Sequence, residues 1–219
     1  LNSDKGMSLK LIIGKAEEKL PSLVNIFSLQ YFTLNPSLRI PASDSFSKVS
    51  GKGIERLKNA GIEVVVGILE KECRDLNKRF FTFHEKQRPY VILKWAQSKD
   101  GFLDKLRRND EKGVNWISSP ETKALVHKWR SEEQSILVGR KTVQNDNPTL
   151  TVREFSGENP IRILIDSQLQ LKSEYNIFSD EAPTIVFNRV KNDKVGSVEW
   201  VKIAETDTQL ILDELYKRN

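Results

Sequence analysis

Cysteine and histidine are scarce in this sequence of 219 residues. It contains one cysteine, Cys73, and two histidines, His84 and His127. A single thiol cannot form an internal disulfide, and a cysteine-rich metal cluster is excluded. We therefore expect no metal site in this chain.

Long apolar runs and a strong charge of one sign are also missing. No stretch approaches the roughly 20 apolar residues that cross a bilayer, and Leu9–Ile13 is too short for the core of a signal peptide. The 35 basic and 30 acidic residues give a net charge of +5. The densest basic run, Lys105–Arg108, lacks interleaved aromatic residues, which favours a solvated surface turn over a nucleic-acid contact. We expect a soluble cytoplasmic protein without a nucleic-acid or membrane partner.

Helices and strands alternate along most of the chain. Residues 1–46 carry no motif and stay unassigned. Helices are expected at 54–60, 70–80, 119–131 and 208–217, and strands at 62–69, 90–96, 135–139, 161–166, 184–188 and 198–203. The strand at 62–69 is nearly all apolar, as a buried parallel strand would be. This alternation predicts an α/β fold with a largely parallel sheet.

The predicted helix at 119–131 places three basic side chains on one face. Lys123, His127 and Arg130 follow at intervals of four and three residues. The face is either a solvated basic surface or an anion site in which Arg130 offers its planar guanidinium to a phosphate. By itself, His127 is interpreted as a surface histidine rather than a catalyst.

Polar residues follow the ends of two predicted strands. Thr142 and Asp146 lie just after the strand that ends at Gly139, and Ser167 follows the strand at 161–166. Ligands of open α/β sheets gather at such strand ends. With Arg153 further along the chain, the pattern weakly favours a site for a phosphorylated ligand.

Taken together, these segments resemble the reductase half of the bifunctional riboflavin biosynthesis deaminase–reductase family. The order and spacing of the segments carry the resemblance. The matching segments are Arg88–Gly101, Ser118–Glu121, His127–Arg130, Ile136–Gly139, Thr142–Val143, Asp146–Arg153 and Ile161–Ser167. The resemblance implies a dihydrofolate-reductase-like reductase domain at 88–219. Residues 47–87 resemble the tail of the family's α/β deaminase domain, together with a linker.

The resemblance also implies a reaction, the NADPH-dependent reduction of 5-amino-6-(5-phosphoribosylamino)uracil to its ribitylamino product. Residues that match the family's NADPH site are Ala96, Trp116, Thr142, Asp146 and Ser167. Residues that match its site for the phosphorylated pyrimidine substrate are Arg130, Leu150 and Arg153. Lys94 is either a catalytic residue near the reacting ribose or a plain strand lysine. The family tends to form dimers, so we expect a homodimer.

The chain departs from the family pattern at two places. It lacks the His-x-Glu and Pro-Cys-x-x-Cys segments that hold the deaminase zinc, so zinc and deaminase activity are not expected here. A Glu-Gly-Gly-like loop that cradles cofactor phosphates would follow the helix at 208–217, and we expect the reductase domain to be truncated before it. The alternative function is therefore an inactive remnant that folds or dimerises without turnover.

Overall fold

The computed structural model describes residues 10–14, 37–40, 51–108 and 111–218. These residues divide into two compact units. The first contains residues 10–14 and 91–218, and the second contains residues 37–40 and 51–90. Each unit is described by itself.

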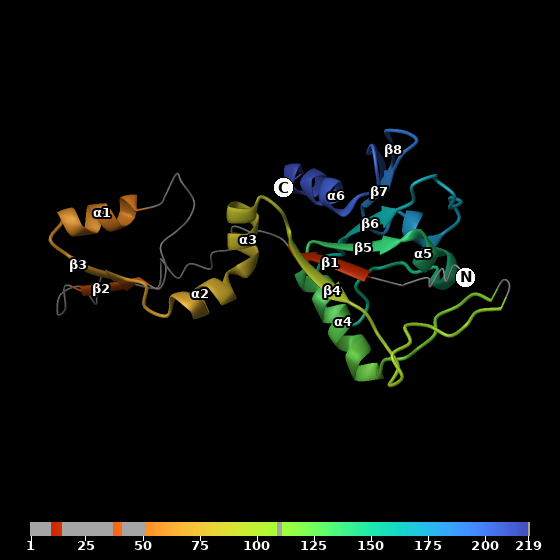
Figure 1. Cartoon of the computed structure of the whole chain (residues 1–219), viewed down its shortest axis with the longest axis horizontal. Helices are drawn as coiled ribbons and strands as arrows, with labels where there is room; N and C mark the ends of the chain where they lie inside the picture. Colours follow the sequence, from red (N-terminus) through yellow and green to blue (C-terminus); the bar gives the residue numbers. More distant parts are fainter. Residues whose placement is uncertain (1–9, 15–36, 41–50, 109–110, 219) are drawn as a thin grey trace. The chain divides into compact units, whose positions relative to one another are not determined.

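The first unit is built on a seven-stranded sheet of the described residues (Figure 1). Its spatial order is β4 (Tyr90–Lys94), β1 (Lys10–Gly14), β5 (Ser135–Gly139), β6 (Ile161–Ile165), β7 (Thr184–Asn188), β9 (Val198–Lys202) and β8 (Asp193–Val195). Strands β5, β6, β7 and β9 are parallel neighbours, whereas β1 and β8 pair antiparallel with β5 and β9. The predicted α/β class with a largely parallel sheet is confirmed.

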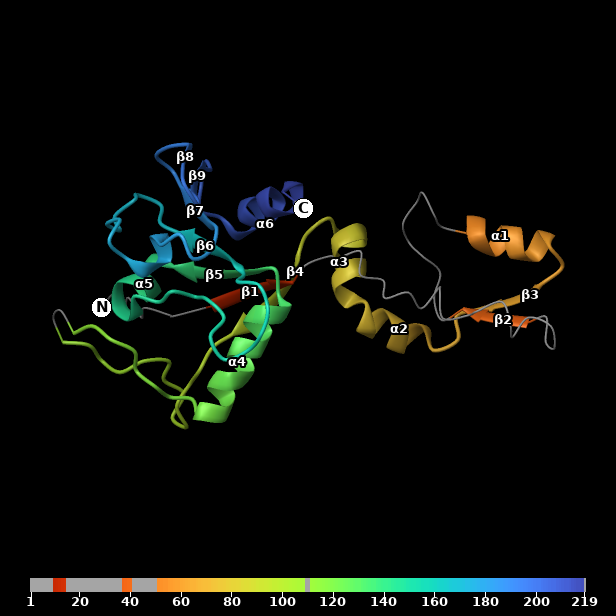
Figure 2. The ribbon, with the colours of Figure 1, turned by 180° about the vertical axis from the view of Figure 1, so that it is seen from behind.

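Alternate residues of the central strands build two separate cores, one on each face of the sheet. On one face, Ile136 and Leu164 pack with Val143 of α5 (Arg140–Asp146), and Trp129 of α4 (Pro120–Glu132) lies against them. On the other face, Ile163 packs with residues of α6 (Thr208–Lys217). Figures 1 and 2 show α4 and α6 on opposite sides of the sheet. Strands buried on both faces require the near-continuous apolar sequences seen in this chain.

Helix α4 begins where its sequence predicts. Ser119 is extended, and its hydroxyl accepts a hydrogen bond from the backbone N–H of Thr122, while Pro120 occupies the first helical position. The cap satisfies one of the free N–H groups of the first turn, and the proline has no N–H to satisfy. The helix thus starts at a fixed residue.

The structure assigns part of the N-terminal segment that the sequence left without a prediction. Lys10–Gly14 forms β1, whose residues pair with β5 in a register that runs from Lys10 opposite Val138 to Ile13 opposite Ser135. Residues 37–40 form β2. The remainder of 1–46 lies outside the described residues.

The second unit contains β2 (Ser37–Ile40) and β3 (Glu63–Val66) in a parallel pair, together with three helices. The helices are α1 (Lys52–Asn59), α2 (Glu70–Leu76) and α3 (Lys78–Lys86). Two predictions were wrong here. The strand is shorter than 62–69 and largely exposed rather than buried, and the single helix at 70–80 is two helices divided at Asn77. Among the described residues, no helix is long and apolar enough to span a membrane.

Candidate functional site

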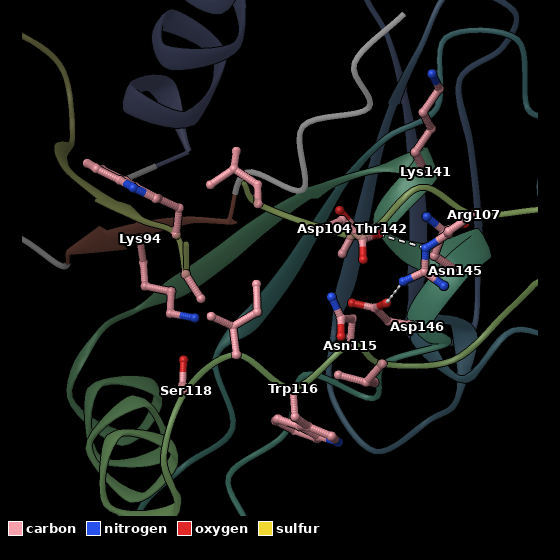
Figure 3. Close-up of a pocket in the computed structure, with 15 residues that line it drawn as sticks. Lys94, Asp104, Arg107, Asn115, Trp116, Ser118, Lys141, Thr142, Asn145 and Asp146 are labelled. Carbon is pink, nitrogen blue, oxygen red and sulfur yellow. Dashed lines mark hydrogen bonds and ion pairs between the residues drawn. The ribbon is translucent and has the colours of Figure 1, made fainter. Parts of the chain in front are cut away.

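A cavity lies at the end of β4, where three segments meet (Figure 3). The end of β4 supplies one wall, the loop from Leu103 to Ser118 supplies the second, and α5 supplies the third. The lining residues are Lys94, Trp95, Ala96, Leu103, Asp104, Arg107, Val114, Asn115, Trp116, Ile117, Ser118, Lys141, Thr142, Asn145 and Asp146. The cavity is therefore bounded by side chains from the edge strand, a long loop and the helix that follows β5.

Helix α5 carries two of the predicted site residues into this cavity. It begins directly after β5, and it places both Thr142 and Asp146 on the cavity wall. Thr142 is buried, whereas Asp146 is partly buried and lies beside the guanidinium of Arg107. Residues four positions apart share one face of a helix, which explains why both reach the same cavity.

Lys94 occupies the opposite wall. Its side chain extends from the end of β4 into the cavity (Figure 3). Burial, together with the charge of Arg130, lowers the pKa of the Lys94 ammonium below its ordinary value. Both causes disfavour the charged form, so an anion that binds nearby would relieve an existing electrostatic cost.

Arg130 is buried near the C-terminal end of α4. Arg130 is 8% exposed, and its Nη1 donates a hydrogen bond to the carbonyl oxygen of Thr151 at 3.1 Å. Its Nε is buried without a hydrogen-bond partner. Burial and the neighbouring charge of Arg153 lower the pKa of Arg130 to about 10. A buried guanidinium with this little compensation carries an electrostatic cost that an anion would lower.

His127 belongs to the same cluster. It is 3% exposed, so its interpretation as a surface histidine was wrong. Nε2 lies 3.5 Å from Nη2 of Arg153 and 4.0 Å from the exposed carboxylate of Glu154, while Nδ1 is buried without a hydrogen-bond partner. We name Arg130, His127 and Arg153 the basic cluster. Glu154 is a counter-charge beside this cluster, and Arg130 and His127 each have one buried nitrogen without a hydrogen-bond partner.

Leu150 takes a backbone conformation that is unusual for leucine. Its φ is 59°, and its side chain is buried in the core with 1% exposure. The strained backbone is held from both sides, because Arg162 donates to the carbonyl of Thr149 and Arg130 donates to that of Thr151. Such strain persists where the surroundings fix it. Leu150 thus shapes the segment beside the basic cluster, and its side chain faces the core.

Of two further predicted residues, Trp116 lines the cavity and Ser167 does not. Trp116 lines the cavity and is 60% exposed, with the ammonium of Lys123 3.9 Å from its ring centroid. Ser167 follows β6, and its hydroxyl donates to Thr206 at 3.1 Å, outside the cavity lining. The structure therefore gathers Lys94, Ala96, Trp116, Thr142 and Asp146 in one cavity, and it places Leu150 and Ser167 elsewhere.

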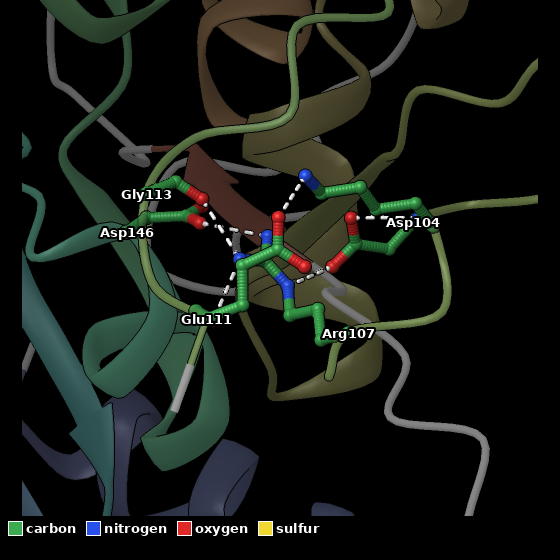
Figure 4. Close-up of polar contacts among 6 residues, drawn as sticks. Asp104, Arg107, Glu111, Gly113 and Asp146 are labelled. Atoms are coloured by element: carbon green, nitrogen blue, oxygen red, sulfur yellow. Dashed lines mark hydrogen bonds and ion pairs between the residues drawn. The ribbon is translucent and has the colours of Figure 1, made fainter. Parts of the chain in front are cut away.

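Sequence reasoning missed Arg107, which it had assigned to a solvated surface turn. The side chain of Arg107 is only 15% exposed and contacts acceptors from several parts of the loop (Figure 4). Its neighbours Lys105 and Arg108 are exposed, as predicted. A run of basic residues does not reveal which side chain points inward, and no signal in the sequence distinguishes Arg107 from Arg108.

The described residues contain no group of three or more His, Cys, Asp or Glu side chains that could hold a metal ion. The chemistry available at the site is that of cationic and hydrogen-bonding groups around an open cavity. It suits an anionic ligand held beside a larger ligand with polar and aromatic surfaces.

Comparison with known proteins identifies the family. The family model of the RibD C-terminal domain matches residues 89–219. The chain belongs to the RibD C-terminal domain family. Among curated RibD relatives, the riboflavin biosynthesis protein RibD of Aquifex aeolicus is 42% identical over 166 residues, which are 75% of this chain and 44% of that protein. The protein of the same name from Synechocystis is 34% identical, over 78% of this chain and 48% of that one.

Solved structures agree with the family assignment. The diaminohydroxyphosphoribosylaminopyrimidine deaminase/5-amino-6-(5-phosphoribosylamino)uracil reductase of Thermotoga maritima is similar with a TM-score of 0.72 and 34% identity, over 83% of this chain and 51% of that chain. RibD of Acinetobacter baumannii is similar with a TM-score of 0.63 and 25% identity, over 84% of this chain and 52% of that chain. The chain spans about half the length of these RibD proteins. The predicted family and its dihydrofolate-reductase-like α/β fold are confirmed.

Proposed function

We propose that this RibD-family domain acts in riboflavin biosynthesis and reduces 5-amino-6-(5-phosphoribosylamino)uracil with NADPH. The observation that carries the proposal is the basic cluster beside the cavity of Lys94 and Thr142. Buried nitrogens without partners in Arg130 and His127 fit a phosphate, and the adjoining cavity offers room for a second ligand.

The cavity residues fit a dinucleotide cofactor. Thr142 and Asp146 would hold it along α5, and Ala96 and Trp116 would line its opposite side. NADPH supplies the hydride when it is bound. The task of the chain is to orient the two ligands and to keep water from the reacting atoms, because the hydride donor is the cofactor.

The basic cluster would hold the substrate by its phosphate. Arg130 and Arg153 present planar guanidinium groups, and such groups bind phosphate through paired hydrogen bonds. Lys94 lines the cavity, and the charge of Arg130 lowers its pKa. The lysine would therefore place a cation beside the ribose that undergoes reduction.

Titration with NADPH tests the cofactor part of the proposal. Energy transfer from tryptophan to the reduced nicotinamide should saturate as NADPH is added, because Trp95 and Trp116 line the cavity. Thr142→Ala should weaken this binding. Thr122→Ala is the matched control, since Thr122 lies in the first turn of α4 and does not line the cavity. Absence of saturable binding would contradict the cofactor assignment.

A further inference from the structure

The loop that forms one wall of the cavity has little regular structure of its own. Between β4 and α4, the described residues form turns and bends without a helix or strand. Eight of the cavity-lining residues nevertheless come from this segment, from Leu103 to Ser118. Because this loop segment lacks the regular backbone hydrogen bonds of a helix or sheet, other contacts must hold it in position.

Arg107 supplies those contacts (Figure 4). Nε donates to Oδ2 of Asp104 at 2.7 Å, and Nη1 donates to the carbonyl oxygens of Gly113 at 3.0 Å and Glu111 at 3.3 Å. Nη2 lies 3.9 Å from Oδ1 of Asp146 on α5. One guanidinium thus joins Asp104, near the start of the loop, to Glu111 and Gly113 and to Asp146 on α5.

The charges of this cluster favour the same arrangement. The hydrogen bond and charge of Asp104 raise the pKa of Arg107. Burial raises the pKa of the Asp104 carboxyl, but the contacts with Arg107, the backbone N–H of Lys105 and the side chain of Asn115 together hold the pKa below its ordinary value. Both groups are therefore charged at neutral pH, and the contact is a charge-assisted hydrogen bond.

A second contact joins the same two walls. The backbone N–H of Gly113 donates to the carbonyl oxygen of Asn145 at 2.7 Å, one residue before Asp146. Arg107 donates to the carbonyl oxygen of the same glycine, so it holds Gly113 in place for the backbone contact. The two contacts reach the end of the helix that also carries Thr142.

We propose that Arg107 is a positioning residue, which fixes loop residues 103–108 and 111–118 against α5 and so sets the shape of the cofactor cavity. The identity of the ligand rests on the proposed function, whereas the role of Arg107 in the loop does not. An arginine is needed because its planar fork reaches acceptors in several directions, which the single ammonium of a lysine cannot do.

The test compares Arg107→Ala and Arg107→Lys with the wild type, and Arg108→Ala serves as the control because Arg108 is the exposed neighbour. Hydrogen exchange measured by mass spectrometry reports the amide of Gly113, and the NADPH titration reports the cavity. We expect exchange at Gly113 to accelerate about tenfold or more in both Arg107 variants, while exchange in β5 and β6 stays unchanged. The NADPH Kd should rise about fivefold or more.

Unchanged exchange at Gly113 in Arg107→Ala would overturn the proposal. So would faster exchange with an unchanged NADPH Kd, because the loop would then be held by Arg107 without effect on the cavity. Full rescue by lysine would show that charge alone suffices and would contradict the need for a planar fork. If the wild type does not bind NADPH at all, the proposed function fails, and exchange at Gly113 then decides by itself whether Arg107 holds the loop.

Discussion

Nε2 of His127 lies 3.5 Å from Nη2 of Arg153, so a buried imidazole faces the guanidinium of an exposed arginine. Burial, followed by the charges of Arg130 and Arg153, lowers the pKa of His127 below its ordinary value, whereas Glu154 opposes this effect weakly and Lys123 adds to it. The imidazole is therefore neutral at pH 7. A phosphate bound between these groups would add negative charge and reverse the shift.

The first prediction concerns the titration of His127. A proton NMR titration should show a lowered pKa for His127, and addition of inorganic phosphate should raise that pKa. The chain contains only two histidines, so His84→Asn assigns the resonances and His84 serves as the internal control. Equal responses of both histidines to phosphate would contradict a specific anion site at His127.

The second prediction concerns stability against pH. The pKa of His127 is lower in the folded than in the unfolded state, so the unfolded state binds the extra proton first. Stability from this group is fully present above the unfolded pKa of about 6.5 and is lost as the pH falls through that value toward the folded pKa. Urea unfolding at pH 8 and pH 5 should show a smaller acid loss in His127→Asn than in the wild type. An identical pH dependence of both proteins would contradict the burial of a neutral imidazole.

The third prediction concerns substrate binding by Arg130. Arg130→Gln removes the guanidinium that we assign to the substrate phosphate, and hydrogen bonds to charged groups contribute about 1.5–3 kcal/mol. The KM for the phosphorylated pyrimidine should therefore rise about 10- to 100-fold, while the NADPH Kd changes little. Lys128→Gln is the matched control, since Lys128 is exposed on the same helix. A KM that is unchanged in Arg130→Gln would remove this arginine from the site.

The fourth prediction concerns Arg162, a charged residue that is fully buried on the central strand β6. Its guanidinium donates to the carbonyl oxygens of Thr149, Asn176, Ser179 and Ala182, and to the hydroxyl of Ser179. Arg162→Met would leave several buried acceptors without a donor, so the free energy of unfolding should fall by about 3–5 kcal/mol. Arg189→Met, at an exposed position, should change it by less than about 0.5 kcal/mol. Equal effects of the two variants in chemical denaturation would contradict a structural role of Arg162.

The sequence predicted the regular parts of the reductase fold well. The strand at 184–188 and the helix at 208–217 match β7 and α6 residue for residue, because apolar periodicity and the Asp207 cap define them locally. Leu210 illustrates the limit. It is 41% exposed, whereas Leu212, two residues further along the same helix, is buried. Closely spaced leucines on a short helix do not reveal which one meets the sheet.

Parts of the site depended on contacts that no local pattern encodes. Thr142 and Asp146 were found from their place after a strand. The predictions for Arg107 and His127 were wrong, because contacts outside the local pattern cover both side chains: Arg107 contacts Gly113 and Asp146, and His127 contacts Arg153. The pairing of β1 with β5 likewise joins residues more than a hundred positions apart.

Substrate-dependent oxidation of NADPH by this chain tests the central claim most directly. The measurement follows the absorbance of the reduced cofactor with and without 5-amino-6-(5-phosphoribosylamino)uracil, in the wild type, Arg130→Gln and Lys128→Gln. The account predicts oxidation that needs the substrate, is retained in Lys128→Gln and is strongly reduced in Arg130→Gln at limiting substrate. Saturable NADPH binding without any oxidation in the wild type would contradict the claim and would identify an inactive remnant.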